Sequence, residues 1–164
     1  MITIGLKMPD YLRQWLVDAN GGSQPVSFPK GSPFNSFLRV FLRNKRERIE
    51  EPDFEADQEV QITVPSFPGK DPYSFNWLPA KARKQFAELI REYFDAELFN
   101  DMSRFDIVSR RKQRSELLIL WMEQHGIEPT DKNFCAVNKR LQLLRQRATD
   151  RTRKRLEYQK KKRK

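Results

Sequence analysis

Apolar and polar residues alternate strictly over residues 2–8, where every even-numbered position is apolar. The same pattern returns over residues 59–64, and a short extended piece is expected at residues 26–28. A period of two is typical of a half-buried strand, because successive side chains point to opposite faces. Residues 2–8 and 59–64 are therefore predicted strands.

Elsewhere, apolar residues recur three and four positions apart, which predicts amphipathic helices. Ser32 followed by Pro33 is typical of a helix start, with a capping hydroxyl and a proline at the first helical position. The predicted helices cover residues 10–19, 33–45, 79–101, 106–125 and 131–148.

The limits of the later helices follow from single residues. The sequence Met-Ser-Arg at 102–104 is expected to interrupt the helical region, and Gly126 is expected to end a helix. Thr130 or Asp131 is the expected cap of the last helix. Beyond Ala148 this helix loses its apolar side, so the remaining residues are expected to fray.

These elements predict a mainly α-helical protein of the α+β class. Residues 1–72 are expected to form a small module with a β element and two helices. Residues 73–150 are expected to form a three-helix unit, and residues 151–164 a flexible basic tail. Residues 46–58 are acidic and lack periodicity, which is typical of an exposed loop.

Charge is distributed unevenly along the 164 residues. The net charge is +10 and the isoelectric point about 9.9. Residues 104–164 carry 19 basic and 7 acidic side chains, whereas residues 46–71 carry 3 and 8. An even surplus of cations would serve solubility, but a concentrated one indicates a polyanion partner. Double-stranded DNA is the partner that we favour.

Candidate catalytic groups are scarce. The chain has one histidine, His125, and one cysteine, Cys135, and neither a P-loop nor a dinucleotide-binding glycine motif occurs. His125 precedes Gly126 and is expected to contact the last carbonyls of its helix. One histidine and one cysteine do not make an ordinary zinc site. We therefore expect a non-enzymatic protein without cofactor or metal.

The cellular location follows from what the sequence lacks. A single cysteine allows no disulfide within the chain. The first residues do not have the basic and apolar regions of a secretory signal, and no apolar run approaches the length of a membrane span. A cytoplasmic protein with no membrane partner is expected.

Residues 109–147 combine a helix, a turn after glycine and a basic helix, and this order resembles a helix-turn-helix. In such a unit the last helix lies in the major groove. Residues 132–147 contain five basic side chains and no acidic one. The outward, DNA-contacting side chains are expected to be Lys132, Asn133, Lys139, Arg140, Gln142, Arg145, Gln146 and Arg147.

Residues 2–45 have the order strand, helix, helix, which resembles the ribbon-helix-helix family of DNA-binding proteins. The resemblance implies a homodimer in which the strands of two chains pair and enter the major groove. Thr3 and Lys7 would then read bases, although Gly5 between them offers no side chain. Ser32 would set a backbone N–H against phosphate. The alternative is a sheet within one chain, made with residues 26–28 and 60–64.

The basic end of the chain is expected to bind phosphates without reading sequence, through the release of counterions. Its candidate contacts are Arg151, Arg153, Lys154 and Arg155. The function that we favour is a DNA-binding accessory or regulatory protein, for example in transcription regulation, of a type found in prophages and other mobile elements. The alternatives are an RNA-binding protein and a protein-interaction module whose tail docks on an acidic partner.

Overall fold

The computed structural model describes residues 1–47, 58–108 and 113–162, so most of the predicted acidic loop lies outside the described residues. In these residues the chain is mainly helical, with five α-helices, a short 3-10 helix at Lys45–Glu47 and a two-stranded antiparallel sheet near the N-terminus. The predicted α+β class is confirmed. The elements are β1 (Thr3–Met8), α1 (Asp10–Asp18), α2 (Pro33–Phe41), β2 (Gln58–Thr63), α3 (Ala80–Val108), α4 (Arg114–Gln124) and α5 (Asp131–Lys162).

The two strands pair within the chain, in a register that sets Ile4 opposite Ile62 and Leu6 opposite Val60. All four side chains are buried. Val26 adds a parallel bridge to Ile62 on the opposite edge of β2. Of the two arrangements that the sequence left open, the structure therefore has the sheet within one chain.

Helix α2 begins as predicted, because the Oγ of Ser32 accepts a hydrogen bond from the Asn35 N–H at 3.1 Å. Its aromatic face packs on α3, where the rings of Phe37 and Phe86 stack with centroids 4.8 Å apart. Large rings fill the space between helices from few positions, which suits a chain with a modest share of apolar residues.

Helix α3 is continuous over 29 residues, so the predicted break at 102–104 is wrong. Met102 is 1% exposed and continues the buried stripe of Phe94 and Leu98, each four positions from the next. A helix whose apolar stripe continues stays packed on the core. The following helix consequently starts at Arg114 and not at residue 106.

Helix α4 ends at Gln124, two residues before Gly126, which was the predicted stop. Gly126 has a φ of 66°, in the left-handed region that favours glycine. The predicted contact of His125 is confirmed, since its Nδ1 lies 2.7 Å from the carbonyl oxygen of Trp121.

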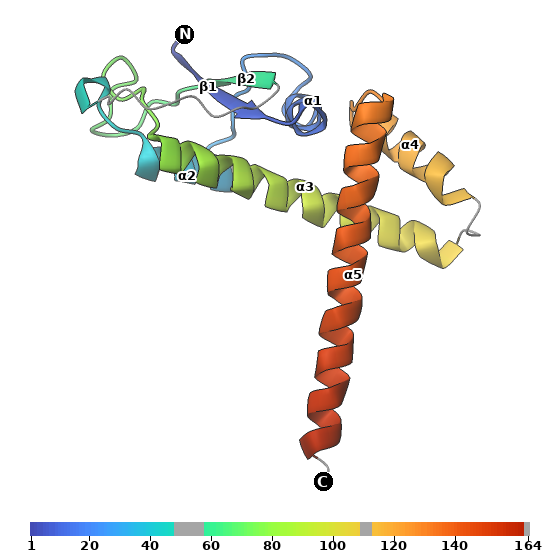
Figure 1. The fold of residues 1–164 in the computed structure, drawn as a ribbon. Helices are drawn as coiled ribbons and strands as arrows, with labels where there is room; N and C mark the ends of the chain where they lie inside the picture. The colour runs from blue at the N-terminus through green and yellow to red at the C-terminus, as the bar shows by residue number, and fades with distance from the viewer. Residues whose placement is uncertain (48–57, 109–112, 163–164) are drawn as a thin grey trace.

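Helix α5 runs over 32 residues, so the prediction that the helix frays soon after Ala148 is wrong. Residues 131–162 contain no glycine or proline, and Lys, Arg, Gln and Leu are good helix formers. Its first part packs across α3, whereas its second part projects far from the body (Figure 1). The predicted loss of the apolar side is confirmed, because every described side chain of residues 151–162 is exposed.

One continuous hydrophobic core joins the elements on both sides of the predicted boundary at residue 72. It includes Leu12 of α1, Phe86 of α3 and Trp121 of α4, all at most 1% exposed. The base of α5 is therefore fixed to a single packed body. No helix in the described part of the chain has the length and apolar character needed to cross a membrane.

Candidate nucleic-acid interface

The predicted order of helix, turn and basic helix is present from Arg114 onward. Thr130 is the cap of α5, because its Oγ1 accepts a hydrogen bond from the Asn133 N–H at 3.2 Å. Asp131 lies in the first turn, where a carboxylate interacts favourably with the helix dipole. The position and start of α5 are thus set by local capping as well as by packing.

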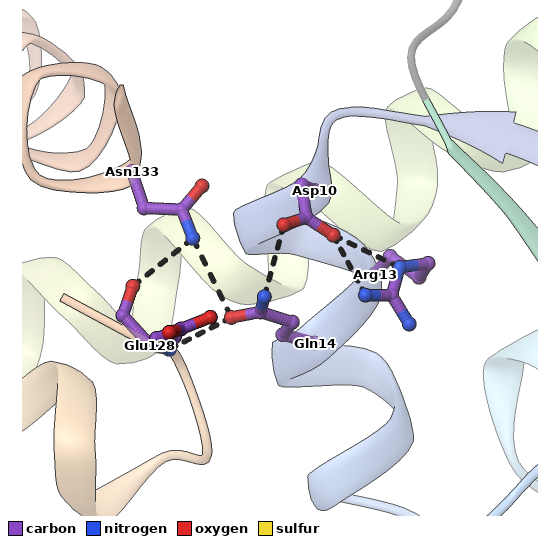
Figure 2. A network of polar contacts seen from close by, with 5 residues as sticks. All are labelled: Asp10, Arg13, Gln14, Glu128 and Asn133. Atoms are coloured by element: carbon purple, nitrogen blue, oxygen red, sulfur yellow. Dashed lines mark hydrogen bonds and ion pairs between the residues drawn. The ribbon is translucent and has the colours of Figure 1, made fainter. Parts of the chain in front are cut away.

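A polar network fixes the start of α5 against α1 (Figure 2). Gln14 Oε1 accepts hydrogen bonds from the Glu128 N–H at 2.7 Å and from Asn133 Nδ2 at 3.5 Å. Asn133 Nδ2 also donates to the Glu128 carbonyl at 3.0 Å. On the other side, Gln14 Nε2 donates at 2.9 Å to Asp10, whose second oxygen pairs with Arg13 at 2.7 Å. The network links α1, the turn and α5.

The prediction that Asn133 lies on the outward face is wrong, because the residue is 3% exposed. Its amide is used in the network with Gln14 and Glu128, and it lies one turn before the buried Val137. An amide held in this way does not reach a base edge. Asn133 is therefore a residue that positions α5.

Arg140 was also expected to face outward, and this prediction is wrong as well. Its guanidinium donates from Nε to Asp95 Oδ1 at 2.7 Å and from Nη2 to Asp95 Oδ2, in a two-pronged ion pair. The side chains of Arg140 and Asp95 are 22% and 11% exposed. The hydrogen bonds with Asp95 raise the pKa of Arg140 above its ordinary value. Arg140 thus joins α5 to α3.

The other residues predicted to contact DNA on the packed part of α5 differ in how far their side chains are exposed to solvent. Arg145 is half-buried and has an interaction within the protein. The exposed ones are Lys132, Lys139, Gln142, Gln146 and Arg147.

We call residues 151–162 the basic arm. It carries seven basic side chains and one acidic side chain, Glu157. Twelve helical residues span about 18 Å at the usual rise of a helix. The predicted contacts Arg151, Arg153, Lys154 and Arg155 all lie here and are exposed. Arg153 makes an exposed ion pair with Asp150 at 3.4 Å, which contributes little.

The cations of α5 are spread around much of the helix, and two groups of them lie on opposite faces. With a turn of about 100° per residue, Arg151 and Arg155 continue the line of Val137, which is buried, and Leu144, which is partly buried against the core. Lys139 and Arg153 lie about half a turn away, with Gln142 and Gln146. The first face is covered by the body up to residue 148 and becomes free beyond it. We call its continuation on the basic arm the inner face, formed by Arg151, Lys154, Arg155, Tyr158 and Lys162.

The residues predicted on the strand lie on the solvent face of the sheet. Thr3 is exposed and opposite Thr63, and Lys7 is half-buried and opposite Glu59. A Cβ on Gly5 would lie 1.7 Å from Glu59 Oε1, so this carboxylate covers the middle of the face. Because a carboxylate here repels phosphate, the sheet is a poorer DNA surface than the basic arm.

Comparisons with known protein families, with curated proteins and with solved structures found no significant match for this chain. Two residues that shape α5, Asp95 and Gln14, were missed in the sequence. Asp95 does give a signal, because it is a carboxylate next to Phe94 on the buried stripe of α3, where a charged partner is required.

Proposed function

We propose that this protein is a non-enzymatic DNA-binding accessory or regulatory protein, and that its main contact is the basic arm of α5. The observation that carries the proposal is the exposure of every described side chain of a basic helix that projects from a packed body. A single α-helix fits the major groove, which is about 12 Å wide. Seven cations over about 18 Å match the dense phosphates of a duplex.

The inner face is the side that we expect to meet the duplex. It concentrates four of the arm's cations, Arg151, Lys154, Arg155 and Lys162, whereas the opposite face also carries Glu157. Tyr158 lies among these cations, and Lys162 Nζ is 5.7 Å from the centre of its ring. Cations supply affinity that is independent of sequence. Among the exposed residues of the packed part, Arg147 lies nearest to the inner face and is then a secondary contact, whereas Lys139, Gln142 and Gln146 lie on the opposite side of the helix.

The test compares two doubly substituted chains with equal charge. Arg151→Gln with Arg155→Gln removes two inner cations, and Lys139→Gln with Arg153→Gln removes two from the opposite face. Duplex affinity is measured against salt concentration for both and for the unchanged chain. We expect the inner pair to weaken binding about 10- to 30-fold near 0.15 M salt and to reduce the salt slope by about 2, whereas the outer pair changes affinity less than threefold.

Two outcomes would reject the proposal. If the unchanged chain binds duplex DNA without a steep salt dependence, phosphate contacts do not hold the complex. If both double variants lose affinity equally, the inner face has no special role. Competition by double-stranded or single-stranded RNA in the same assay separates DNA binding from RNA binding, because an RNA-binding protein would prefer the RNA.

A further inference from the structure

Helices α3 and α4 bring three potential ligand groups together away from the basic arm. Glu97 and Asp101 are four residues apart on α3 and therefore lie on the same side of that helix. His125, just after α4, faces them. Its Nε2 lies 3.6 Å from Glu97 Oε1 and 3.8 Å from Asp101 Oδ2. One ligand atom from each of the three residues lies within 4.8 Å of the others.

Each of these groups is oriented by a further hydrogen bond. The indole N–H of Trp15 donates to Glu97 Oε2 at 2.8 Å, which leaves Oε1 directed at the histidine. The indole N–H of Trp121 donates to Asp101 Oδ2 at 3.0 Å. The ring of Trp121 also stacks on that of His125, with centroids 4.1 Å apart. Ligands that are oriented in this way are typical of metal sites.

The contact of His125 with the backbone shows that its Nδ1 atom carries a hydrogen. The Nδ1 atom of His125 lies 2.7 Å from the carbonyl oxygen of Trp121. A carbonyl oxygen only accepts, so Nδ1 must carry the hydrogen. Nε2, the other ring nitrogen, faces Glu97 Oε1 and Asp101 Oδ2. The three residues therefore turn potential ligand atoms toward one shared position.

The distances between these groups leave room for a shared metal ion. A direct hydrogen bond from a ring nitrogen to a carboxylate would be about 2.7–2.9 Å long. The observed separations of 3.6 and 3.8 Å are longer. They are close to the spacing of about 3.4 Å between ligands around a tetrahedral zinc ion with bonds of about 2.1 Å.

We propose that Glu97, Asp101 and His125 bind one divalent transition-metal ion, such as Zn²⁺, with water at the remaining positions. One imidazole and two carboxylates form a donor set that suits such ions better than an all-oxygen set would. The side chains of His125, Asp101 and Glu97 are 21%, 30% and 42% exposed, so an ion has access from solvent. The bound ion would join the end of α4 to the middle of α3.

This proposal is independent of DNA binding, since none of the three ligands lies on α5. In the sequence, one histidine and one cysteine do not predict a metal site. The spacing of Glu97 and Asp101 by one helical turn is the signal that points to one. The packing of α4 on α3, which brings His125 next to Glu97 and Asp101, cannot be predicted from the sequence.

The experiment uses the full-length chain with Cys135→Ser, because the exposed thiol of Cys135 could bind metal by itself. Co²⁺ is titrated while its visible absorption is recorded, and the melting temperature is measured with Zn²⁺ and with Mg²⁺. We expect one Co²⁺ per chain, and a higher melting temperature with Zn²⁺ but not with Mg²⁺. His125→Gln and Asp101→Asn should each weaken Co²⁺ binding at least tenfold, whereas Glu123→Gln, at an exposed carboxylate of α4, should not.

The conservative variant Asp101→Asn retains an oxygen that can accept the indole hydrogen bond of Trp121, and circular dichroism checks that each variant is folded. The proposal is overturned if the parent chain shows no saturable Co²⁺ spectrum and no stabilisation by Zn²⁺. It is equally overturned if folded His125→Gln binds Co²⁺ as tightly as the parent. Either result would leave the cluster as a histidine packed beside two carboxylates without a metal ion.

Discussion

The packed part of α5, residues 131–148, and the basic arm, residues 151–162, belong to the same helix but have opposite environments. In the packed part, Asn133 and Val137 are at most 3% exposed, and Arg140 is held by Asp95. In the basic arm every described side chain is exposed. The backbone is helical throughout, so the difference lies in what the side chains contact and not in local conformation.

This difference shows that basic residues of one helix can have different roles. Arg140 and Arg147 are seven residues apart and have the same chemistry, yet one is paired with a buried carboxylate and the other is exposed. Positive charge in the packed part is in part structural. In the basic arm, none of the described ion pairs joins a cation to a carboxylate of the body. The positive charge of the arm therefore remains available for a polyanion.

The largest difference in stability is expected between Arg140→Gln and Arg147→Gln. The first leaves Asp95 without its partner in a buried position, which costs about 3 kcal/mol of unfolding free energy. The second removes an exposed cation and changes the unfolding free energy by less than about 0.5 kcal/mol. Urea unfolding followed by circular dichroism measures both. Equal midpoints would mean that the ion pair does not hold α5 to α3.

A smaller difference is expected between Asn133→Ala and Gln142→Ala. Asn133→Ala removes the amide that links Gln14 to the Glu128 carbonyl and should lower the unfolding free energy by about 1–2 kcal/mol. Gln142 is exposed on the same helix, and its replacement should be neutral within about 0.5 kcal/mol. The same urea titration measures both variants. A neutral Asn133→Ala would show that the network of Figure 2 does not contribute to stability.

The smallest effect on global stability is expected for Thr152→Pro in the basic arm. A proline inside a helix costs about 3 kcal/mol where the helix is packed, but here it breaks only a segment that has no packing. We expect the urea midpoint of the body to stay within error, while the helical signal in circular dichroism decreases. Duplex affinity should fall, because the cations lose their common face. A large shift of the midpoint would show that the arm packs on the body.

Much of the local structure could be predicted from the sequence. The alternation of residues 2–8 gave a strand, the Ser32 hydroxyl gave a cap, and the contact of His125 with the helix end was expected. The orientation of Asn133 and Arg140 could not be predicted in this way. Their partners, Gln14 and Asp95, are 119 and 45 residues away in sequence, and only tertiary packing brings them together.

The missed continuity of α3 has a similar origin. The local composition of Met102, Ser103 and Arg104 predicts a break, because it contains no information about the surface on which α3 packs. Met102 is buried against the core, and packing of an apolar face supplies most of the stability of a helix in a folded protein. For the candidate interface, composition places cations on α5, but it does not tell which of them pair with the body, as Arg140 does with Asp95.

The continuous helix between body and basic arm has a consequence for how the chain can change over evolution. Substitutions in the arm leave the body unaffected, but the number of residues between Ala148 and Arg151 determines the direction in which the arm's cations point. One inserted residue would turn them by about 100° and two by about 200°, to the opposite side. Seven would restore the direction within about 20° and move the cations about 10 Å farther from the body. Natural variation in length is therefore expected here in steps near seven residues, and changes of one or two residues should be rare.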